Sequence, residues 1–229
     1  MARVCTVVVS DVTPYDEALR VQRALFTARR AGLIEDTLWL VEHPPTISVG
    51  RHPGARSHLL GDEETLAARG ITVYDSDRGG DITWHGPGQL VGYPIFDLNA
   101  HYLDAGRYLR DLEEALIQTL ADFSVEGRRI PGLTGVWVGD EKIAAIGVKI
   151  SYWVTMHGFS LNVSPDLNEY NAIIPCGLEG RRVTSLARVL DHPVPMKAAQ
   201  SSVIRRLLAL FQLSDERTSL ADLTRRFSG

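Results

Sequence analysis

The sequence has few of the residues that mark disulfide-rich, metal-binding or membrane proteins. Only two cysteines, Cys5 and Cys176, occur in 229 residues, and their separation excludes a disulfide framework and zinc-finger spacing. No apolar run could span a bilayer, and the N-terminus lacks the apolar core of a signal peptide. A net charge of -4 excludes a general basic field for nucleic acid, although a local basic patch could still bind an acidic protein. We therefore expect a cytoplasmic protein without nucleic-acid or membrane partners.

Lysine is also scarce. It occurs only at Lys142, Lys149 and Lys197 among 24 basic side chains, so arginine supplies the other 21. Genomic base composition or a warm habitat explains most of this bias. Even so, arginine does not lose its proton in a protein, whereas the pKa of lysine responds to its surroundings. A lysine close to a cleft is therefore a candidate proton carrier.

Several common catalytic signatures are missing. The sequence contains no Gly-x-Ser-x-Gly elbow, no His-Glu-x-x-His helix and no phosphate-binding GxxxxGK[ST] loop. Its seven histidines are scattered without the spacing of metal ligands. These absences argue against a serine hydrolase, a zinc protease and a nucleotide hydrolase, and we expect neither a metal nor a cofactor.

The residues that are present describe an ordinary globular chain. Hydrophobic residues make up 45% and charged residues 23%, which suits one domain spanning residues 1–229. Periodicity predicts strands at 4–9, 37–41, 46–49, 71–74, 82–84, 90–96, 136–138, 142–154 and 156–163. It predicts helices at 15–31, 63–68, 103–123, 196–211 and 220–227, the first with Thr13 as its N-cap. Hairpins mixed with helices predict an α+β sandwich, in which helices flank a mixed β-sheet.

Cys176 ends the apolar run Ile173–Gly177 at a Pro-Cys-Gly corner. Pro175 restricts one backbone torsion and Gly177 permits torsions that other residues avoid, so the corner can hold a thiol at the mouth of a cleft. A thiolate there is a strong nucleophile that accepts and releases acyl groups. The alternative is a small buried hydrophobe, which is the usual role of a free cysteine.

The segment 78–94, RGGDITWHGPGQLVGYP, combines five glycines with Arg, Asp, Trp and His. Glycines let backbone amides approach a ligand closely, and binding residues concentrate on such loops. Arg78 is a candidate for holding an anion, and His85 for exchanging a proton. The alternative is a pair of tight hairpin turns with satisfied polar side chains.

Lys142 begins a strand that continues through the small residues Ala144, Ala145 and Gly147. Small side chains on a sheet leave room for an apolar chain to lie across it. Taken alone, a solvated hairpin lysine beside closely packed strands is the more common arrangement. His157 begins the partner strand, where it either faces the site or serves as a structural histidine.

Together these residues resemble the lipoyl(octanoyl) transferase family, which moves octanoyl groups from acyl carrier protein to lipoyl domains. The resemblance runs from about Leu38 to Leu186 and is specific, because long blocks recur in a fixed order. The blocks are Glu42-His43-Pro44-Pro45, Ser48-Val49-Gly50-Arg51, 78–94, 135–149 and 157–186, the last with Ile174-Pro175-Cys176-Gly177 and Val183-Thr184-Ser185-Leu186.

The resemblance implies the fold of biotin protein ligase and lipoate-protein ligase catalytic domains. It implies that Cys176 carries the acyl group and that Lys142 is its basic partner. It also implies an acyl pocket lined by Arg78, Gly79, Gly80, Asp81, Ile82, Thr83, Trp84, His85, Ala145, Ile146, Gly147, Gly158, Phe159 and Ser160.

The implied donor is octanoyl-acyl carrier protein, which delivers the group on phosphopantetheine, so no separate cofactor is needed. The implied acceptors are lipoyl domains of 2-oxoacid dehydrogenase complexes and the glycine cleavage H protein, and a monomer is expected. Two alternatives stay open. An ATP-dependent lipoate or biotin ligase would form an acyl-adenylate, and a non-catalytic module that grips a carrier or lipoyl domain would not need Cys176.

Overall fold

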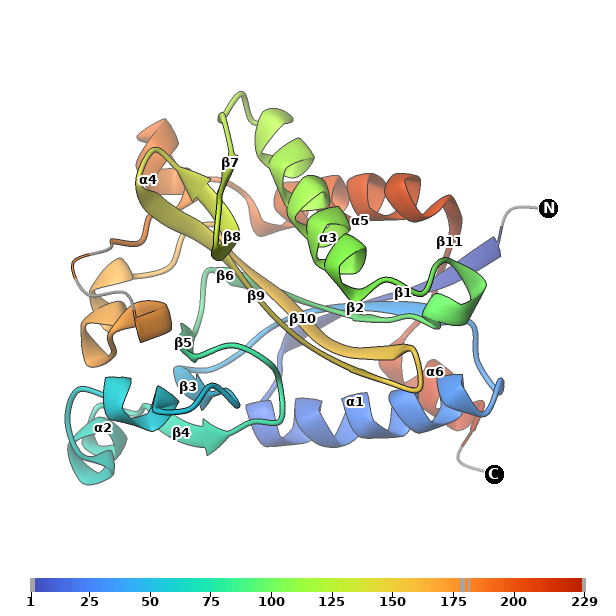
Figure 1. Cartoon of the computed structure of the whole chain (residues 1–229), viewed down its shortest axis with the longest axis horizontal. Helices are drawn as coiled ribbons and strands as arrows, with labels where there is room; N and C mark the ends of the chain where they lie inside the picture. The colour runs from blue at the N-terminus through green and yellow to red at the C-terminus, as the bar shows by residue number, and fades with distance from the viewer. Residues whose placement is uncertain (1–2, 178–179, 181, 228–229) are drawn as a thin grey trace.

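The fold is built on a large mixed sheet (Figure 1). The computed structural model describes residues 3–177, 180 and 182–227, except for the side chain of Cys176. Within those ranges eight strands pair in the order β11-β1-β2-β6-β10-β9-β8-β7. Strand β1 is parallel to both β2 and β11, and the other neighbours are antiparallel. The strands are β1 (Arg3–Val12), β2 (Asp36–Glu42), β6 (Gln89–Ile95), β7 (Arg128–Ile130), β8 (Leu133–Val138), β9 (Glu141–Ser151), β10 (Val154–Asn162) and β11 (Leu213–Arg217).

Alternation along the central strands divides the core between the two faces of this sheet. Val7 and Leu40 belong to one apolar cluster, whereas their neighbours Val8 and Trp39 belong to the other. Because successive side chains of a strand point to opposite faces, apolar residues at consecutive positions require cover on both sides. The sandwich follows from this requirement.

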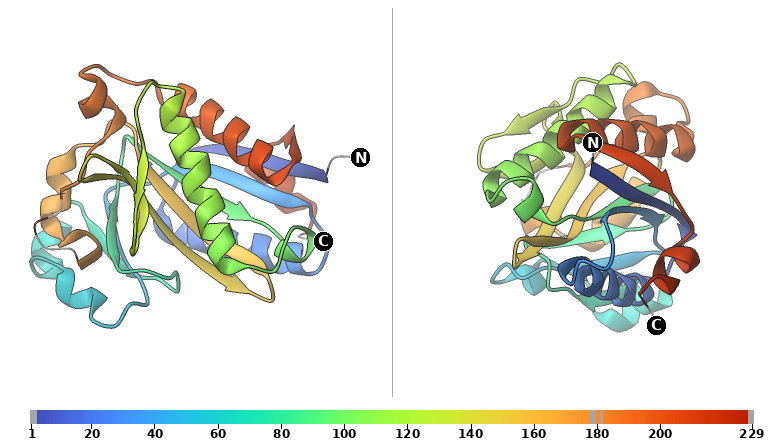
Figure 2. Two further views of the ribbon diagram at one scale, coloured as in Figure 1. Left: turned by 45° about the horizontal axis from the view of Figure 1, so that its top comes forward. Right: turned by 90° about the vertical axis from the view of Figure 1, so that its right-hand side faces the viewer.

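Helices cover both faces of the large sheet (Figures 1 and 2). Helices α3 (Ala105–Ala121) and α5 (Met196–Phe211) pack on one face, and α1 (Tyr15–Arg30) and α6 (Leu220–Arg225) on the other. The predicted mixed sheet flanked by helices is therefore confirmed. No helix in the described ranges is both long and apolar enough to cross a bilayer.

A small sheet lies beside the central strands of the large one (Figure 1). Within the described residues it has the order β4-β3-β5, formed by β4 (Thr72–Asp75), β3 (Thr46–Val49) and β5 (Ile82–His85). Strand β3 is parallel to β4 and antiparallel to β5. Its apolar cluster joins the small sheet to the segment that leads into the Cys176 corner, which we define as residues 175–177.

The short helical segments are η1 (Ala55–His58), α2 (Glu63–Ala68), η2 (Leu98–Ala100), η3 (Leu167–Ala172), η4 (Pro175–Gly177) and α4 (Leu186–Leu190).

Several local expectations are wrong. Helix α1 has Pro14 as its N-cap, and the Thr13 hydroxyl donates to the Asp11 carbonyl instead. The alternative of a hairpin turn at Gly79-Gly80 is also excluded, because β3 lies between β4 and β5. The β9–β10 turn falls at Tyr152-Trp153, earlier than expected, with both residues at positive φ.

Other elements were not predicted. Strands β7 and β11 lie at the edges of the large sheet and have little apolar patterning. The polar segment before Cys176 contains the turn η3, and Cys176 itself lies within η4.

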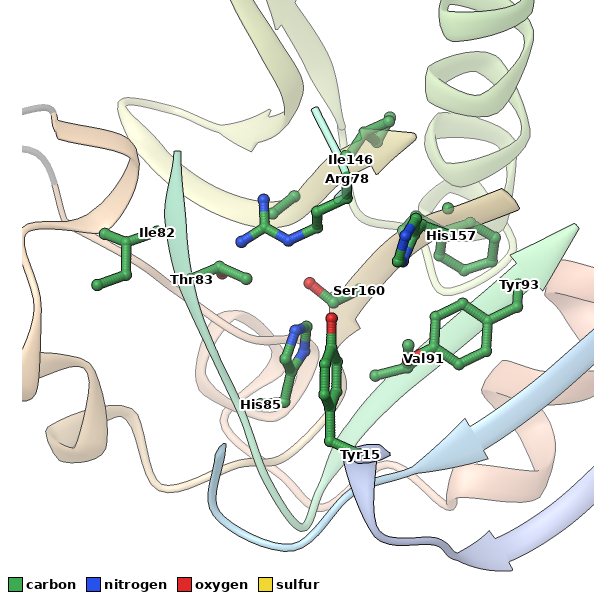
Figure 3. A pocket seen from close by; sticks show the side chains of 14 residues that line it. Tyr15, Arg78, Ile82, Thr83, His85, Val91, Tyr93, Ile146, His157 and Ser160 are labelled. Carbon is green, nitrogen blue, oxygen red and sulfur yellow. The ribbon is translucent and has the colours of Figure 1, made fainter. Parts of the chain in front are cut away.

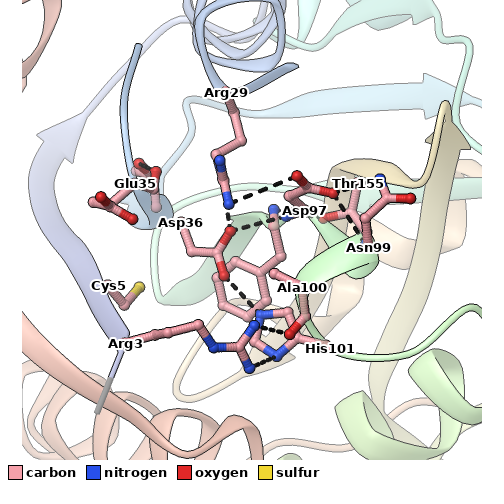
Figure 4. Close-up of polar contacts among 12 residues, drawn as sticks. Arg3, Cys5, Arg29, Glu35, Asp36, Asp97, Asn99, Ala100, His101 and Thr155 are labelled. Atoms are coloured by element: carbon pink, nitrogen blue, oxygen red, sulfur yellow. Dashed lines mark hydrogen bonds and ion pairs between the residues drawn. The ribbon is translucent and has the colours of Figure 1, made fainter. Parts of the chain in front are cut away.

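A buried charge cluster ties the start of β2 to α1 and to the segment after β6 (Figure 4). Asp36 accepts from Arg29 Nε at 2.8 Å and from His101 Nε2 at 2.7 Å. Arg3 donates to His101 Nδ1 at 2.8 Å, and since guanidinium only donates, Nδ1 is the accepting nitrogen. Burial alone would raise the pKa of Asp36, but hydrogen bonds from His101, the Asp97 amide and Arg29 leave it lowered.

Candidate functional site

An apolar cavity lies between the small sheet and the central strands of the large sheet (Figure 3). Ten of the residues expected to line an acyl pocket line this cavity: Arg78, Ile82, Thr83, His85, Ala145, Ile146, Gly147, Gly158, Phe159 and Ser160. Four more residues line the cavity: Tyr15, Val91 and Tyr93, which were not predicted, and His157, for which the sequence left a place at the site as one of two alternatives. The structure thus brings together β5, β9 and β10, as expected, and adds α1 and β6.

The sequence contained a signal for the cavity residues on β6 but none for the cavity residue on α1. Val91 and Tyr93 fall inside the glycine-rich segment 78–94, and strand alternation places them on one face. Tyr15 is the first residue of α1 and reaches the site only through tertiary packing, where its ring stacks with His85 at a centroid distance of 5.8 Å.

Four other expected residues do not line this cavity. Trp84 points to the opposite face of β5 and packs on Tyr170, with ring centroids 5.4 Å apart. The Gly79 amide donates to the Val148 carbonyl at 2.8 Å, which removes it as a donor to a ligand. Gly80 takes a positive φ of 85°, and Asp81 reaches away from the cavity towards two histidines.

Arg78 is fixed to its own scaffold. Its side chain is 8% exposed, and Nη2 donates to the Ser48 carbonyl at 2.6 Å. Nε and Nη2 also donate to Ser48 Oγ, and Nη1 donates to the Gly79 carbonyl at 3.1 Å. The guanidinium thus joins the glycine-rich loop to β3, and the anion-holding role considered from the sequence stays a prediction.

The same serine connects Arg78 to His85. His85 Nδ1 donates to Gln89 Oε1 at 2.8 Å, and Nε2 accepts from Ser48 Oγ, 3.0 Å away. Gln89 is oriented by its own amide, which donates to the Trp84 carbonyl at 3.1 Å and to Asn162 Oδ1 at 3.0 Å. Burial lowers the pKa of His85 to about 3, so this ring is neutral near pH 7 and lacks basicity.

His157 lies at another part of the cavity in a strained conformation. It has a φ of 60° within β10, a torsion that residues other than glycine seldom adopt. Its Nε2 lies 2.8 Å from Asp77 Oδ1, and Lys149 Nζ lies 2.6 Å from Asp77 Oδ2. Burial lowers the pKa of His157 to about 4 despite the neighbouring carboxylate. Partial burial would raise the pKa of Asp77, but hydrogen bonds from Lys149 and His157 lower it to about 2.

Lys142 lines a smaller, adjoining cavity. This cavity contains Lys142 and Pro175 and shares Thr83 and Ala145 with the larger one. Lys142 is only 8% exposed, and its Nζ lies 5.0 Å from the centroid of the Trp137 ring. The alternative that Lys142 is a solvated hairpin lysine is therefore excluded.

The Cys176 corner forms a short 3-10 turn. The Gly177 amide donates to the Ile174 carbonyl at 3.0 Å, and Gly177 takes a φ of 65°. The corner therefore needs glycine, as expected. The side chain of Cys176 lies outside the described residues, so the placement of the corner rests on its backbone and on Pro175.

The glycines of β9 and β10 allow close packing of neighbouring backbone and do not leave open space. A β-carbon at Gly147 would lie 2.7 Å from the Gly79 carbonyl oxygen, and one at Gly158 would lie 2.2 Å from the Gly92 carbonyl oxygen. The expectation that Gly147 reserves room for an apolar chain is therefore wrong, because the glycine-rich loop fills that room. Ala145 lines both cavities, so it remains a candidate for the small residue that leaves room for an apolar chain. Within the described ranges no group of three or more His, Cys, Asp or Glu side chains is placed to hold a metal ion.

Known sequences resemble this chain over most of its length. The lipoyl protein ligase A/B catalytic domain matches residues 14–208. The octanoyltransferase of Chloroflexus aggregans is 50% identical over 202 residues, covering 87% of this chain and 91% of that protein. The octanoyltransferase of Rubrobacter xylanophilus is 51% identical over 194 residues, covering 84% and 87%.

Solved structures share the fold at low identity. A bi-partite lipoate protein ligase from Thermoplasma acidophilum has a TM-score of 0.76 and 15% identity, covering 98% of this chain and 91% of that one. Biotin protein ligase from Aquifex aeolicus has a TM-score of 0.51 and 11% identity, covering 92% and 69%. The expected likeness to lipoate and biotin ligase catalytic domains is thus confirmed for the fold.

Proposed function

Because the chain belongs to the octanoyltransferase family, and is therefore an acyltransferase of lipoate biosynthesis, we propose how it performs the transfer. The donor is octanoyl-acyl carrier protein, and the acceptor is a lysine amine of a lipoyl domain. The acyl group passes through a thioester on Cys176, with Lys142 as the acid and base. The acceptors are the lipoyl domains of 2-oxoacid dehydrogenase complexes and the H protein of glycine cleavage.

One observation carries this proposal. Lys142 and Pro175 line the same small cavity, and that cavity shares Thr83 and Ala145 with the larger apolar one. The proposed base, the corner that bears Cys176 and a space suited to an alkyl chain therefore adjoin one another. A binding module would have no need of a buried lysine at that junction.

The first half-reaction exchanges one thioester for another. The Cys176 thiolate attacks the octanoyl carbonyl, and the bond from that carbon to the phosphopantetheine sulfur breaks as the tetrahedral intermediate collapses. The ammonium of Lys142 gives its proton to the departing thiolate. Because a thioester is consumed and a thioester is formed, the exchange is close to isoenergetic, which suits cysteine better than serine.

The second half-reaction forms an amide. The acceptor amine attacks the acyl-cysteine carbonyl, neutral Lys142 takes the proton that the nitrogen loses, and Cys176 departs as thiolate. The resulting thiolate–ammonium pair is the state that began the cycle. The two buried histidines of the larger cavity are neutral and weakly basic, which favours Lys142 for this proton.

Intact-mass analysis tests the proposal. After incubation with octanoyl-acyl carrier protein, the enzyme should gain one octanoyl mass that maps to the Cys176 peptide. Cys176→Ser should lack this adduct and all transfer while remaining folded. Cys5→Ala is the control, since Cys5 is fully buried in the core and burial raises the pKa of its thiol. Near-normal transfer by Cys176→Ser would refute the thioester intermediate on Cys176. Formation of an acyl-adenylate with ATP would favour a ligase.

A further inference from the structure

A histidine outside the cavity packs on the Cys176 corner. A β-carbon built at Gly177 would lie 2.6 Å from His58 Cε1 and 3.0 Å from Nδ1, so the imidazole fills the place where other residues carry a side chain. The His58 carbonyl also accepts from the Ile174 amide at 2.8 Å, just before the corner. His58 thus supports the corner through both its ring and its main chain.

A buried carboxylate sets the orientation of that ring. His58 Nδ1 donates to Asp81 Oδ1 at 2.8 Å, and the Asp81 side chain is 8% exposed. The same oxygen accepts from the Ile82 amide at 2.6 Å, and Asp81 Oδ2 lies 3.2 Å from His52 Nδ1. The Ile82 amide and the burial of Asp81 therefore hold the carboxylate in place, so that it can fix the plane of the imidazole, whereas His52 contacts it with a mostly exposed side chain.

The His58–Asp81 pair connects the Cys176 corner to the strand that lines the cavities, and the reaction requires these two parts to keep a fixed relative position. Asp81 directly precedes β5, whose Thr83 lines both cavities. His58 ends η1, and the segment after it pairs with the approach to the corner, since Leu59 forms a bridge to Ile173. A shift of either part would alter the distance between the corner and the cavities.

We propose that His58, oriented by Asp81, is a positioning residue that holds the Cys176 corner against the acyl site. The role of the corner in acyl transfer rests on the function proposed above, whereas the contact between His58 and Gly177 does not. The pair acts through Gly177, since Gly177 both needs its positive φ and has no space for a β-carbon beside the ring. Correct placement of a nucleophile matters because a displacement of about 1 Å can cost roughly 100-fold in rate.

Three variants of the full-length enzyme test this role. His58→Ala removes the ring, and His58→Asn keeps a donor near the Nδ1 position without filling the space at Gly177. His52→Ala is the matched control, because His52 is the other histidine on Asp81 and its side chain is 58% exposed. Each variant is measured by hydrogen–deuterium exchange of the peptide that covers the corner and by kcat and KM of octanoyl transfer.

We expect His58→Ala to speed exchange at the corner and to lower kcat by about tenfold or more with KM nearly unchanged, as loss of positioning predicts. His58→Asn should fall between His58→Ala and the wild type, and His52→Ala should match the wild type in both measurements. Wild-type exchange and kcat in His58→Ala, or an equal loss in His52→Ala, would overturn the proposal. Because exchange needs no acyl chemistry, an active Cys176→Ser would refute the thioester and leave the exchange result valid.

Discussion

Lys142 and Val183 form a parallel bridge that ties the start of β9 to the segment after the Cys176 corner. The Lys142 amide donates to the Arg182 carbonyl and its carbonyl accepts from the Thr184 amide, both at 2.9 Å. The proposed base is therefore fixed by its main chain as well as by its burial. Its side chain runs past Gly135, where a β-carbon would lie 2.9 Å from Lys142 Cε.

Lys142→Arg should reduce transfer nearly as much as Lys142→Ala, by about 100-fold or more, although it keeps the charge. Guanidinium stays protonated near neutral pH, so it cannot take the proton from the acceptor amine, and general base catalysis typically contributes about 10²–10⁴-fold. Single-turnover transfer from the isolated acyl-enzyme measures this step.

Lys149→Arg is the matched control on the same strand, because Lys149 pairs with Asp77 and its side chain is 35% exposed. It should retain most activity. A Lys142→Arg enzyme with activity close to that of Lys149→Arg would assign Lys142 an electrostatic role only.

Asp36→Ala should destabilise the protein by about 3 kcal/mol without changing the acyl chain that is accepted. Removing one partner from a buried charge network leaves the others uncompensated, and Asp36 and His101 are each only 3% exposed. Urea unfolding measures the loss. Asp140→Ala is the control, because Asp140 is 81% exposed in its pair with Arg128 and should change stability by less than about 0.5 kcal/mol.

Stability should fall as the pH drops from about 6.5 towards 4. Burial lowers the pKa of His43 and His157 to about 4 and that of His85 to about 3. The unfolded chain, in which histidine titrates near pH 6.5, therefore takes up protons first, and protonation favours unfolding across this window. Each histidine contributes at most about 1.4 kcal/mol per pH unit.

Urea midpoints at several pH values measure this slope. His43→Asn removes one titrating group and keeps a donor for the Thr13 carbonyl, which His43 Nδ1 contacts at 2.6 Å. The slope between pH 6.5 and 4.5 should fall in that variant. An unchanged slope would show that His43 is not among the groups responsible.

Periodicity alone predicted the parts of the fold that bury apolar residues at regular spacing. Strands β1, β2 and β6 and helices α3 and α5 were found because alternation or helical spacing is strong there. Strand β11 was missed because only Leu213 is buried and the rest is polar and exposed. Its place is set by pairing with β1, which no local pattern encodes.

The site was partly readable for the same reason. The glycine-rich loop and the small residues of β9 stood out by composition. The resemblance to the family implied the remaining lining residues of β9 and β10, and most of all these residues line the larger cavity. The sequence could not show that Asp81 turns towards His58, because the two residues meet only when η1 packs on the small sheet. Nor could it show that the absence of a side chain at Gly147 accommodates Arg78 and Gly79.

Ala145→Leu should shorten the acyl chain that the enzyme accepts. Strand residues advance by about 3.3 Å, so Ala145 lies roughly 10 Å along β9 from Lys142. An extended octanoyl chain, with C–C bonds of about 1.5 Å, spans roughly 9 Å, so its tail should end near Ala145 if its carbonyl lies beside Lys142. Blocking two or three methylenes at about 0.8 kcal/mol each should weaken octanoyl transfer by about 2 kcal/mol, or roughly 30-fold.

Transfer from butanoyl, hexanoyl and octanoyl carrier protein gives the comparison, with circular dichroism to confirm folding. Ala145→Ser is the matched control, since it adds one atom at the same position and should keep the preference for octanoyl. Gly147→Val would be a weaker test, because its side chain would meet the Gly79 carbonyl before any ligand. A folded Ala145→Leu enzyme that still prefers octanoyl would place the tail elsewhere, away from Ala145.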